Sequence, residues 1–128
     1  MRLLLDTHAF LWFVLNDARL SANARSLTAD PGNEVLLSPA SYWEIAIKVS
    51  LGRYSVPGDF ADFMDRQVAD NKFTILPITT RHAAVVAALP FHHRDPFDRL
   101  RVAQAMSEGV PLVSGDAALD AYPITRLW

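Results

Sequence analysis

The chain has 128 residues, with 12 basic and 14 acidic side chains and a formal net charge of −2. This length predicts one folded domain over residues 1–128, large enough to form a core without metal or disulfide staples. A hydrophobic content of 51% excludes intrinsic disorder. The absence of cysteine rules out disulfides, zinc–thiolate sites and thiol nucleophiles, and fits a reducing cytoplasm.

The same arithmetic limits the partners. No apolar run approaches the ~18 residues that a membrane span needs, so no membrane association is expected. Asp6 and His8 interrupt the apolar N-terminal stretch, and no small-residue cleavage site follows it, which argues against a signal peptide. The near-neutral charge excludes a broad electrostatic coat for nucleic acid but leaves room for a small phosphate site.

Short apolar runs alternate with helical segments along the chain. In chain order, strands are expected at residues 2–5, 35–37, 73–77, 110–114 and 124–128. Between them, helices are expected at residues 7–15, 22–29, 39–51, 60–70, 80–89, 96–108 and 116–121. Ser21 is suited to cap the second helix, Ser38 or Ser41 the third, and Thr79 or Thr80 the fifth.

This alternation predicts an α/β fold. We expect a three-layer α/β/α sandwich around a central, mostly parallel sheet of four to five strands. In such sheets, functional groups gather beyond the C-terminal ends of the strands. Acidic residues near those ends are therefore the first candidates for a site.

Four carboxylates stand at such positions. Asp6 directly follows the first strand and Asp116 follows the fourth, whereas Glu44 lies in the helix after the second strand. Asp98 lies in the first turn of the helix that Asp95 is expected to cap. If these elements abut, the four carboxylates converge, and their mutual repulsion calls for a hard divalent cation, Mg²⁺ or Mn²⁺.

Each acid also has an ordinary structural interpretation. Asp6 and Asp116 are good helix caps, and Glu44 with Lys48 forms an i,i+4 pair typical of a solvated helix face. Asp98 sits where the helix dipole favours an acid. The joint placement of the four residues favours a site, but chemistry alone leaves both interpretations open.

The segments around these acids resemble a known family, the PIN-domain ribonucleases, and within it the VapC-like toxins of bacterial toxin–antitoxin systems. The similar segments are LLLDTHAFLW with Asp6, LSPASYWEIAIKVSLGR with Glu44, HHRDPFDRLRVAQA with Asp98, and PLVSGDAAL with Asp116. They cover essentially the whole chain in the family's order. The resemblance implies a PIN-like fold.

The resemblance also implies Mg²⁺- or Mn²⁺-dependent cleavage of RNA, a homodimer, and inhibition by a small cognate antitoxin. Asp6, Glu44 and Asp98 would then ligate a metal ion, with Asp116 ligating a second ion or holding a water. Two positions depart from the family pattern. Ser114 stands where many members have Thr. Arg101 stands where an apolar residue is usual, which indicates an exposed face or a partner contact.

Weaker candidates surround the acids. Thr7 and Ser38 could bind a substrate phosphate or a ligand carboxylate, or simply cap helices, and a Ser114 hydroxyl could orient its neighbour. The loop residues His92, His93 and Arg94 are suited to RNA phosphates or to the antitoxin, with a solvated loop as the alternative.

Three other classes of protein share some of these features. A haloacid-dehalogenase-like phosphatase needs a second Asp two positions after Asp6, where this chain has His8. A response-regulator receiver needs an acidic pair after the first strand and a Lys after the last, and neither is visible. A catalytically silent interaction module remains the alternative to the nuclease. The RNA target and the choice between one and two metal ions stay open.

Overall fold

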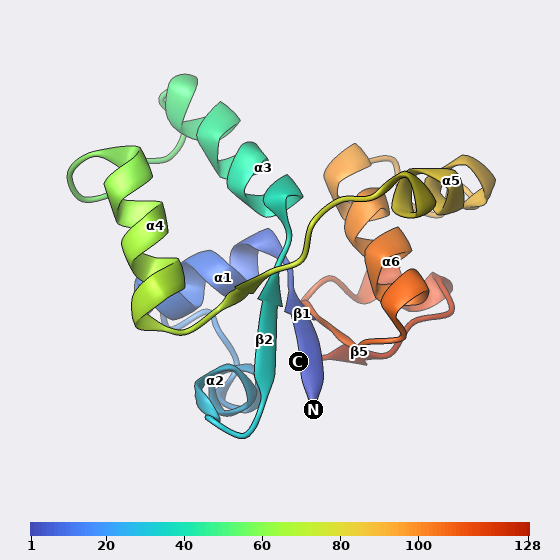
Figure 1. Cartoon of the computed structure of the whole chain (residues 1–128), viewed down its shortest axis with the longest axis horizontal. Helices are drawn as coiled ribbons and strands as arrows, with labels where there is room; N and C mark the ends of the chain where they lie inside the picture. Colours follow the sequence, from blue (N-terminus) through green and yellow to red (C-terminus); the bar gives the residue numbers. More distant parts are fainter.

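A five-stranded parallel sheet organises the computed structural model, which describes all of residues 1–128 (Figure 1). The strand order is β3-β2-β1-β4-β5, and every neighbouring pair is parallel. The strands are β1 (Arg2–Leu5), β2 (Glu34–Leu37), β3 (Thr74–Ile75), β4 (Leu112–Val113) and β5 (Arg126–Leu127). The expected α/β class with a parallel sheet is confirmed. The last three strands are shorter than expected, with two residues each.

The helices follow the predicted order. They are α1 (Thr7–Val14), α2 (Ala22–Ala29), α3 (Pro39–Ser50), α4 (Phe60–Asp70), α5 (Thr80–Ala88) and α6 (Pro96–Glu108). A 3₁₀ turn, η1 (Ala117–Ala121), replaces the short helix expected near the C-terminus. Ser38, rather than Ser41, caps α3, and Thr79 caps α5 in a capping box with His82.

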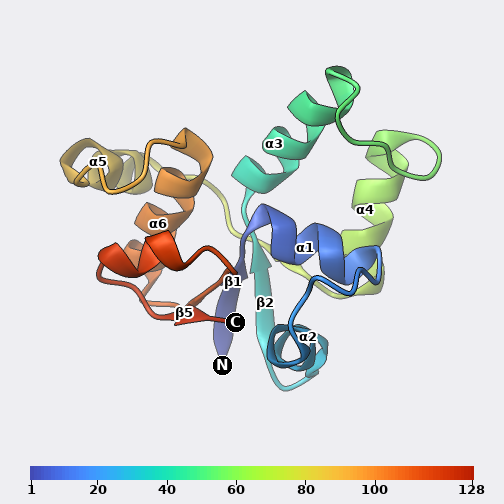
Figure 2. The same ribbon diagram turned by 180° about the vertical axis from the view of Figure 1, so that it is seen from behind.

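The two faces of the sheet carry separate cores. Leu3 and Leu5 belong to a cluster with side chains of α1 to α4, such as Phe10, whereas Leu4 belongs to a cluster with α6 side chains such as Val102. Successive residues of a strand point to opposite faces, which explains this division. Figures 1 and 2 show α1 to α4 on one side of β1 and β2, with α5 and α6 on the other.

The C-terminal ends of the central strands place three polar residues at one edge of the sheet. Asp6 follows β1, Ser38 follows β2 and Ser114 follows β4, and all three are buried. Helix α3 packs against both α1 and α6 above this edge. The edge is therefore where charged groups from α1, α3 and α6 meet. None of the helices has the length and apolar character needed to cross a bilayer.

Phe10 belongs to the larger of the two cores. Phe10 is fully buried and its ring packs edge-on against Phe73 at 5.9 Å between centroids. We expect Phe10→Ala to lower the free energy of unfolding by about 3–5 kcal/mol, because it removes buried apolar area and leaves a cavity. Urea unfolding measures this. Leu51→Ala, at a 61% exposed side chain, is the control and should change stability by less than about 0.5 kcal/mol. Equal losses would contradict the assigned core.

Candidate active site

Asp6 joins β1 to α1 at the edge of the sheet. Its Oδ1 accepts a 2.7 Å hydrogen bond from the backbone N–H of Ala9, so it caps α1, as the ordinary interpretation expected. The residue is only 7% exposed. Burial raises the pKa of Asp6 above its ordinary value, although hydrogen bonds from Ser114 and Ala9 oppose the shift. A cap and a site residue are compatible here, because the second oxygen is not used by the helix.

Glu44 is held by donors on both carboxylate oxygens. Its Oε1 accepts hydrogen bonds from the Thr7 hydroxyl at 2.7 Å and from Arg101 at 3.1 Å. Its Oε2 accepts one from Lys48 Nζ at 3.1 Å. Burial alone would raise the pKa of Glu44, but Thr7, Arg101 and Lys48 together lower it below its ordinary value. Glu44 is therefore a stable carboxylate inside the fold.

Arg101 contradicts the expectation of an exposed face or a partner contact. The residue is 2% exposed and lies between two of the acids. Its Nη1 donates to Thr7 and Glu44, and its Nη2 donates to Asp98 one turn earlier on α6. Burial of an arginine is costly unless its charge is paired, and here two carboxylates pair it. The side chain is a part of the candidate site.

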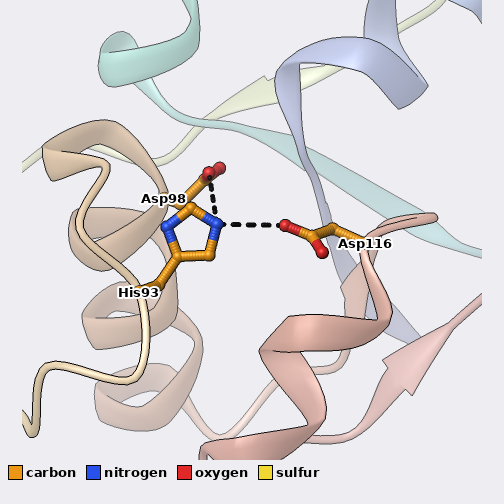
Figure 3. A group of neighbouring side chains, drawn as sticks. All are labelled: His93, Asp98 and Asp116. Atoms are coloured by element: carbon orange, nitrogen blue, oxygen red, sulfur yellow. Dashed lines mark hydrogen bonds and ion pairs between the residues drawn. The ribbon is translucent and has the colours of Figure 1, made fainter.

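His93 connects Asp98 with Asp116 (Figure 3). Its Nε2 lies 3.0 Å from Asp116 Oδ2 and 3.4 Å from Asp98 Oδ2. The backbone N–H of Asp95 donates to the other ring nitrogen, Nδ1, at 3.1 Å. Nδ1 must then be unprotonated, so Nε2 carries the proton and donates to the carboxylates. His93 acts here as a donor that holds two acids together.

Two nitrogen donors thus link three of the predicted acids, and the fourth, Asp6, shares a pocket with Asp116. Asp98 is central, because Arg101 joins it to Glu44 and His93 joins it to Asp116. Burial raises the pKa of Asp98 above its ordinary value, while the charge of Arg101 opposes the shift. Asp6 and Asp116 share a pocket of about 580 Å³, whose other lining residues are His8, Trp12, Arg19, Gly115 and Trp128.

The weaker candidates have different outcomes. Thr7 contacts the site directly, because it donates to Glu44 and accepts from Arg101. Ser38 caps α3 through a hydrogen bond from the Ala40 N–H and does not hydrogen-bond to any of the four acids. Ser114 accepts a 3.1 Å hydrogen bond from the backbone N–H of Asp116.

The three residues of the basic loop before α6 have different surroundings. His93 turns toward the acids, whereas the His92 ring packs against Tyr122 at 5.1 Å between centroids, and Arg94 is exposed. Sequence reasoning assigned all three residues one role. It also treated Ser41 only as a possible helix cap, whereas the Ser41 hydroxyl accepts a 3.3 Å hydrogen bond from Arg101. The three-residue spacing from Ser41 to Glu44 places them on one face of α3 and was the available signal.

The donor set fits a hard divalent cation. Carboxylate oxygens are the ligands that Mg²⁺ and Mn²⁺ prefer, and ligand atoms of Asp98, Asp116 and His93 lie within 4.8 Å of one another. The protonated Nε2 of His93 makes this residue a poor ligand in its present position. Glu44 is a poor ligand as well, because Arg101 and Lys48 already pair both of its oxygens. Asp98, Asp116 and Asp6 are the better candidates.

Comparisons with known proteins cover nearly the whole chain. The family model described as "PIN domain" matches residues 3–124. Ribonuclease VapC22 of Mycobacterium tuberculosis is 31% identical over 120 residues, which cover 93% of this chain and 90% of that protein.

Solved structures give the same architecture. A chain of VapBC2 from Rickettsia felis, bound to a DNA fragment from its promoter, superposes with a TM-score of 0.77 at 16% identity, covering 100% of this chain and 99% of that one. A chain of VapBC-5 from Mycobacterium tuberculosis gives 0.61 at 19% identity, covering 98% of each chain. At these identities the structures establish similarity of fold.

The site generates a prediction about Thr7. We expect Thr7→Val to lower the free energy of unfolding by about 1–3 kcal/mol, because a buried donor to Glu44 and an acceptor for Arg101 are lost while shape is kept. Thr28→Val is the matched control, since the buried Thr28 hydroxyl bonds only a carbonyl of its own helix. Chemical denaturation of both variants gives the comparison. A loss in Thr7→Val no larger than in Thr28→Val would show that the buried network contributes nothing.

Proposed function

This chain belongs to the PIN-domain family, and from that premise we propose that it is a metal-dependent endoribonuclease that serves as the toxin of a toxin–antitoxin pair. The relative that is 31% identical is named a ribonuclease, and the similar solved structures are toxin–antitoxin complexes. The observation that carries the proposal is the cluster of carboxylates at the C-terminal edge of the sheet. Parallel α/β folds place their reactive groups at this edge.

Asp6, Asp98 and Asp116 are the residues that would hold Mg²⁺ or Mn²⁺. When bound, such an ion supplies positive charge that polarises a water and stabilises the negative charge developing at phosphorus. The carboxylates must be ionised to hold it, and burial works against ionisation of Asp6 and Asp98. The charge of Arg101 opposes that effect of burial at both residues and so favours their ionised form.

The chain's own residues have separable roles in this proposal. Asp6 and Asp116 face the shared pocket, where the scissile phosphate would lie. Glu44 stays paired with Arg101 and Thr7 and fixes α3 against α6. No side chain is needed as a covalent nucleophile, because a water oriented at the cluster attacks phosphorus and the 3′ oxygen leaves.

The exposed loop before α6 supplies donors for the substrate. His93 lies 3.4 Å from Asp98 and the next residue, Arg94, is exposed, and the N–H groups of both are suited to phosphate oxygens of an RNA chain. Binding of RNA would require His93 to release Asp98 and Asp116. A small antitoxin protein and a second copy of the chain are the protein partners that the proposal includes.

The substitution that tests the chemistry is Asp6→Asn. We expect RNA cleavage to fall by at least about a thousandfold with the fold intact, because a charged ligand becomes a neutral one at nearly the same volume. Chelation with EDTA should have the same effect on the unaltered chain. Cleavage of a fluorescent RNA pool measures activity, and circular dichroism checks folding.

Asp120→Asn is the matched control, since this exposed acid near Asp116 is paired only with Arg126. Its activity should be unchanged. Full cleavage by Asp6→Asn, or undiminished cleavage in EDTA, would refute the metal-dependent nuclease. A folded chain with no cleavage and no Mn²⁺-dependent thermal shift would instead be a silent interaction module.

The toxin role has its own test. Expression of the chain in bacteria should arrest growth, and expression together with the small open reading frame next to its gene should relieve the arrest. Asp6→Asn should abolish the arrest without the neighbour. Growth that proceeds normally with the active chain would exclude the toxin role while leaving the nuclease in place.

A further inference from the structure

Two side chains with nitrogen donors, Arg101 and His93, each lie between two of the acids. They differ in how deeply they are buried. Arg101 fills the gap between Glu44 and Asp98, where only 3% of its side chain is exposed. His93 fills the gap between Asp98 and Asp116 from a surface loop, with 20% of its side chain exposed.

The Arg101 side chain is held in place by hydrogen bonds to several segments of the chain. Its Nη1 and Nη2 donate to residues of α1, α3 and α6, namely Thr7, Ser41, Glu44 and Asp98. Its Nε is buried with no hydrogen-bond partner in the chain. An arginine does not lose its proton in a protein, so this gap carries a fixed positive charge. Two carboxylates on opposite sides of that charge explain why it is tolerated in the interior.

A divalent ion would meet opposite conditions in the two gaps. Between Glu44 and Asp98 it would have to displace a buried guanidinium and leave that charge without a partner, which is strongly unfavourable. Between Asp98 and Asp116 it would displace only the partly exposed imidazole of His93. That side also adjoins the pocket that Asp6 and Asp116 line.

We propose that Arg101 is a permanent cation of this site, which occupies the place of a second metal ion and limits the chain to one divalent ion on the Asp98–Asp116 side. The proposal rests on the metal-dependent nuclease proposed above and specifies its cofactor stoichiometry. In it, Arg101 is a positioning residue: it fixes Glu44 and Asp98 and supplies part of the positive charge that a second ion would otherwise bring.

The test is calorimetric titration with Mn²⁺ in the absence of RNA. We expect the unaltered chain to bind one ion. Arg101→Gln should bind its first ion at least about tenfold more tightly, or take up a second ion, because one repelling charge a few ångströms away is gone. Arg101→Lys keeps the charge and should resemble the unaltered chain. RNA cleavage should fall in Arg101→Gln even though its metal binding improves.

Arg99→Gln is the matched control on the same helix. Arg99 is also buried, at 5% exposure, but its guanidinium donates only to backbone carbonyls, those of Pro90, Leu89, Val86 and His93. Any general effect of removing a buried arginine from α6 should appear there without a change in Mn²⁺ affinity. Thermal unfolding with and without Mn²⁺ gives a second readout, in which Arg101→Gln should gain more stability from the ion than Arg99→Gln does.

The outcomes separate this inference from the proposed function. Two ions in the unaltered chain, or unchanged Mn²⁺ affinity in a folded Arg101→Gln, would overturn the role of Arg101 and leave the nuclease standing. One ion without RNA cleavage would overturn the nuclease and leave Arg101 standing. Absence of any Mn²⁺ binding would overturn both. If Arg101→Gln does not fold, the stoichiometry of the unaltered chain still decides the matter.

Discussion

The ion pairing of Glu44, Arg101 and Asp98 is the interaction on which the arrangement of the site depends. It connects α3 with α6 beyond the strand ends and buries the charges of Glu44 and Arg101 beside the partly buried Asp98. Removing one partner of a buried ion pair typically costs about 3–5 kcal/mol, because the other charge is left uncompensated. The same three residues therefore fix the positions of α3 and α6 and balance the charge of the site.

The sheet explains why this cluster forms where it does. Both faces of the central strand β1 are covered, by α1 to α4 on one side and α6 on the other, so polar groups have no place there. At the C-terminal end of the strand the chain turns into a helix. The first N–H groups of that helix have no backbone partner. Asp6 uses such a donor as the cap of α1 and still lies on the pocket. The structural role of Asp6 and the chemical role proposed for it thus coincide in one residue.

The sequence predicted the order of the elements and the region in which the acids lie, but not the cations between them. Hydrophobic periodicity and caps are local properties, so the order of helices and strands and the cap Asp95 could be read directly. The burial of Arg101 could not, because an arginine is normally exposed, and its partners include Glu44 and Thr7 from segments far away in the sequence. The orientation of His93 likewise depends on Asp116, 23 residues later. Strands β3, β4 and β5 are shorter than the apolar runs that predicted them, because only two residues of each pair in the outer ladders of the sheet.

The net charge of −2 acquires a different meaning in this arrangement. Four of the acids lie in a single region, so a formal count predicts a strongly negative cleft that an arginine from an antitoxin would neutralise. Arg101 and Lys48 of the chain itself already pair with Glu44, and Arg101 also pairs with Asp98. The uncompensated charge is thus concentrated at Asp6 and Asp116, on the side of the pocket. Under the proposed function, a divalent ion and a cationic side chain of a partner protein would therefore compete for that side of the pocket.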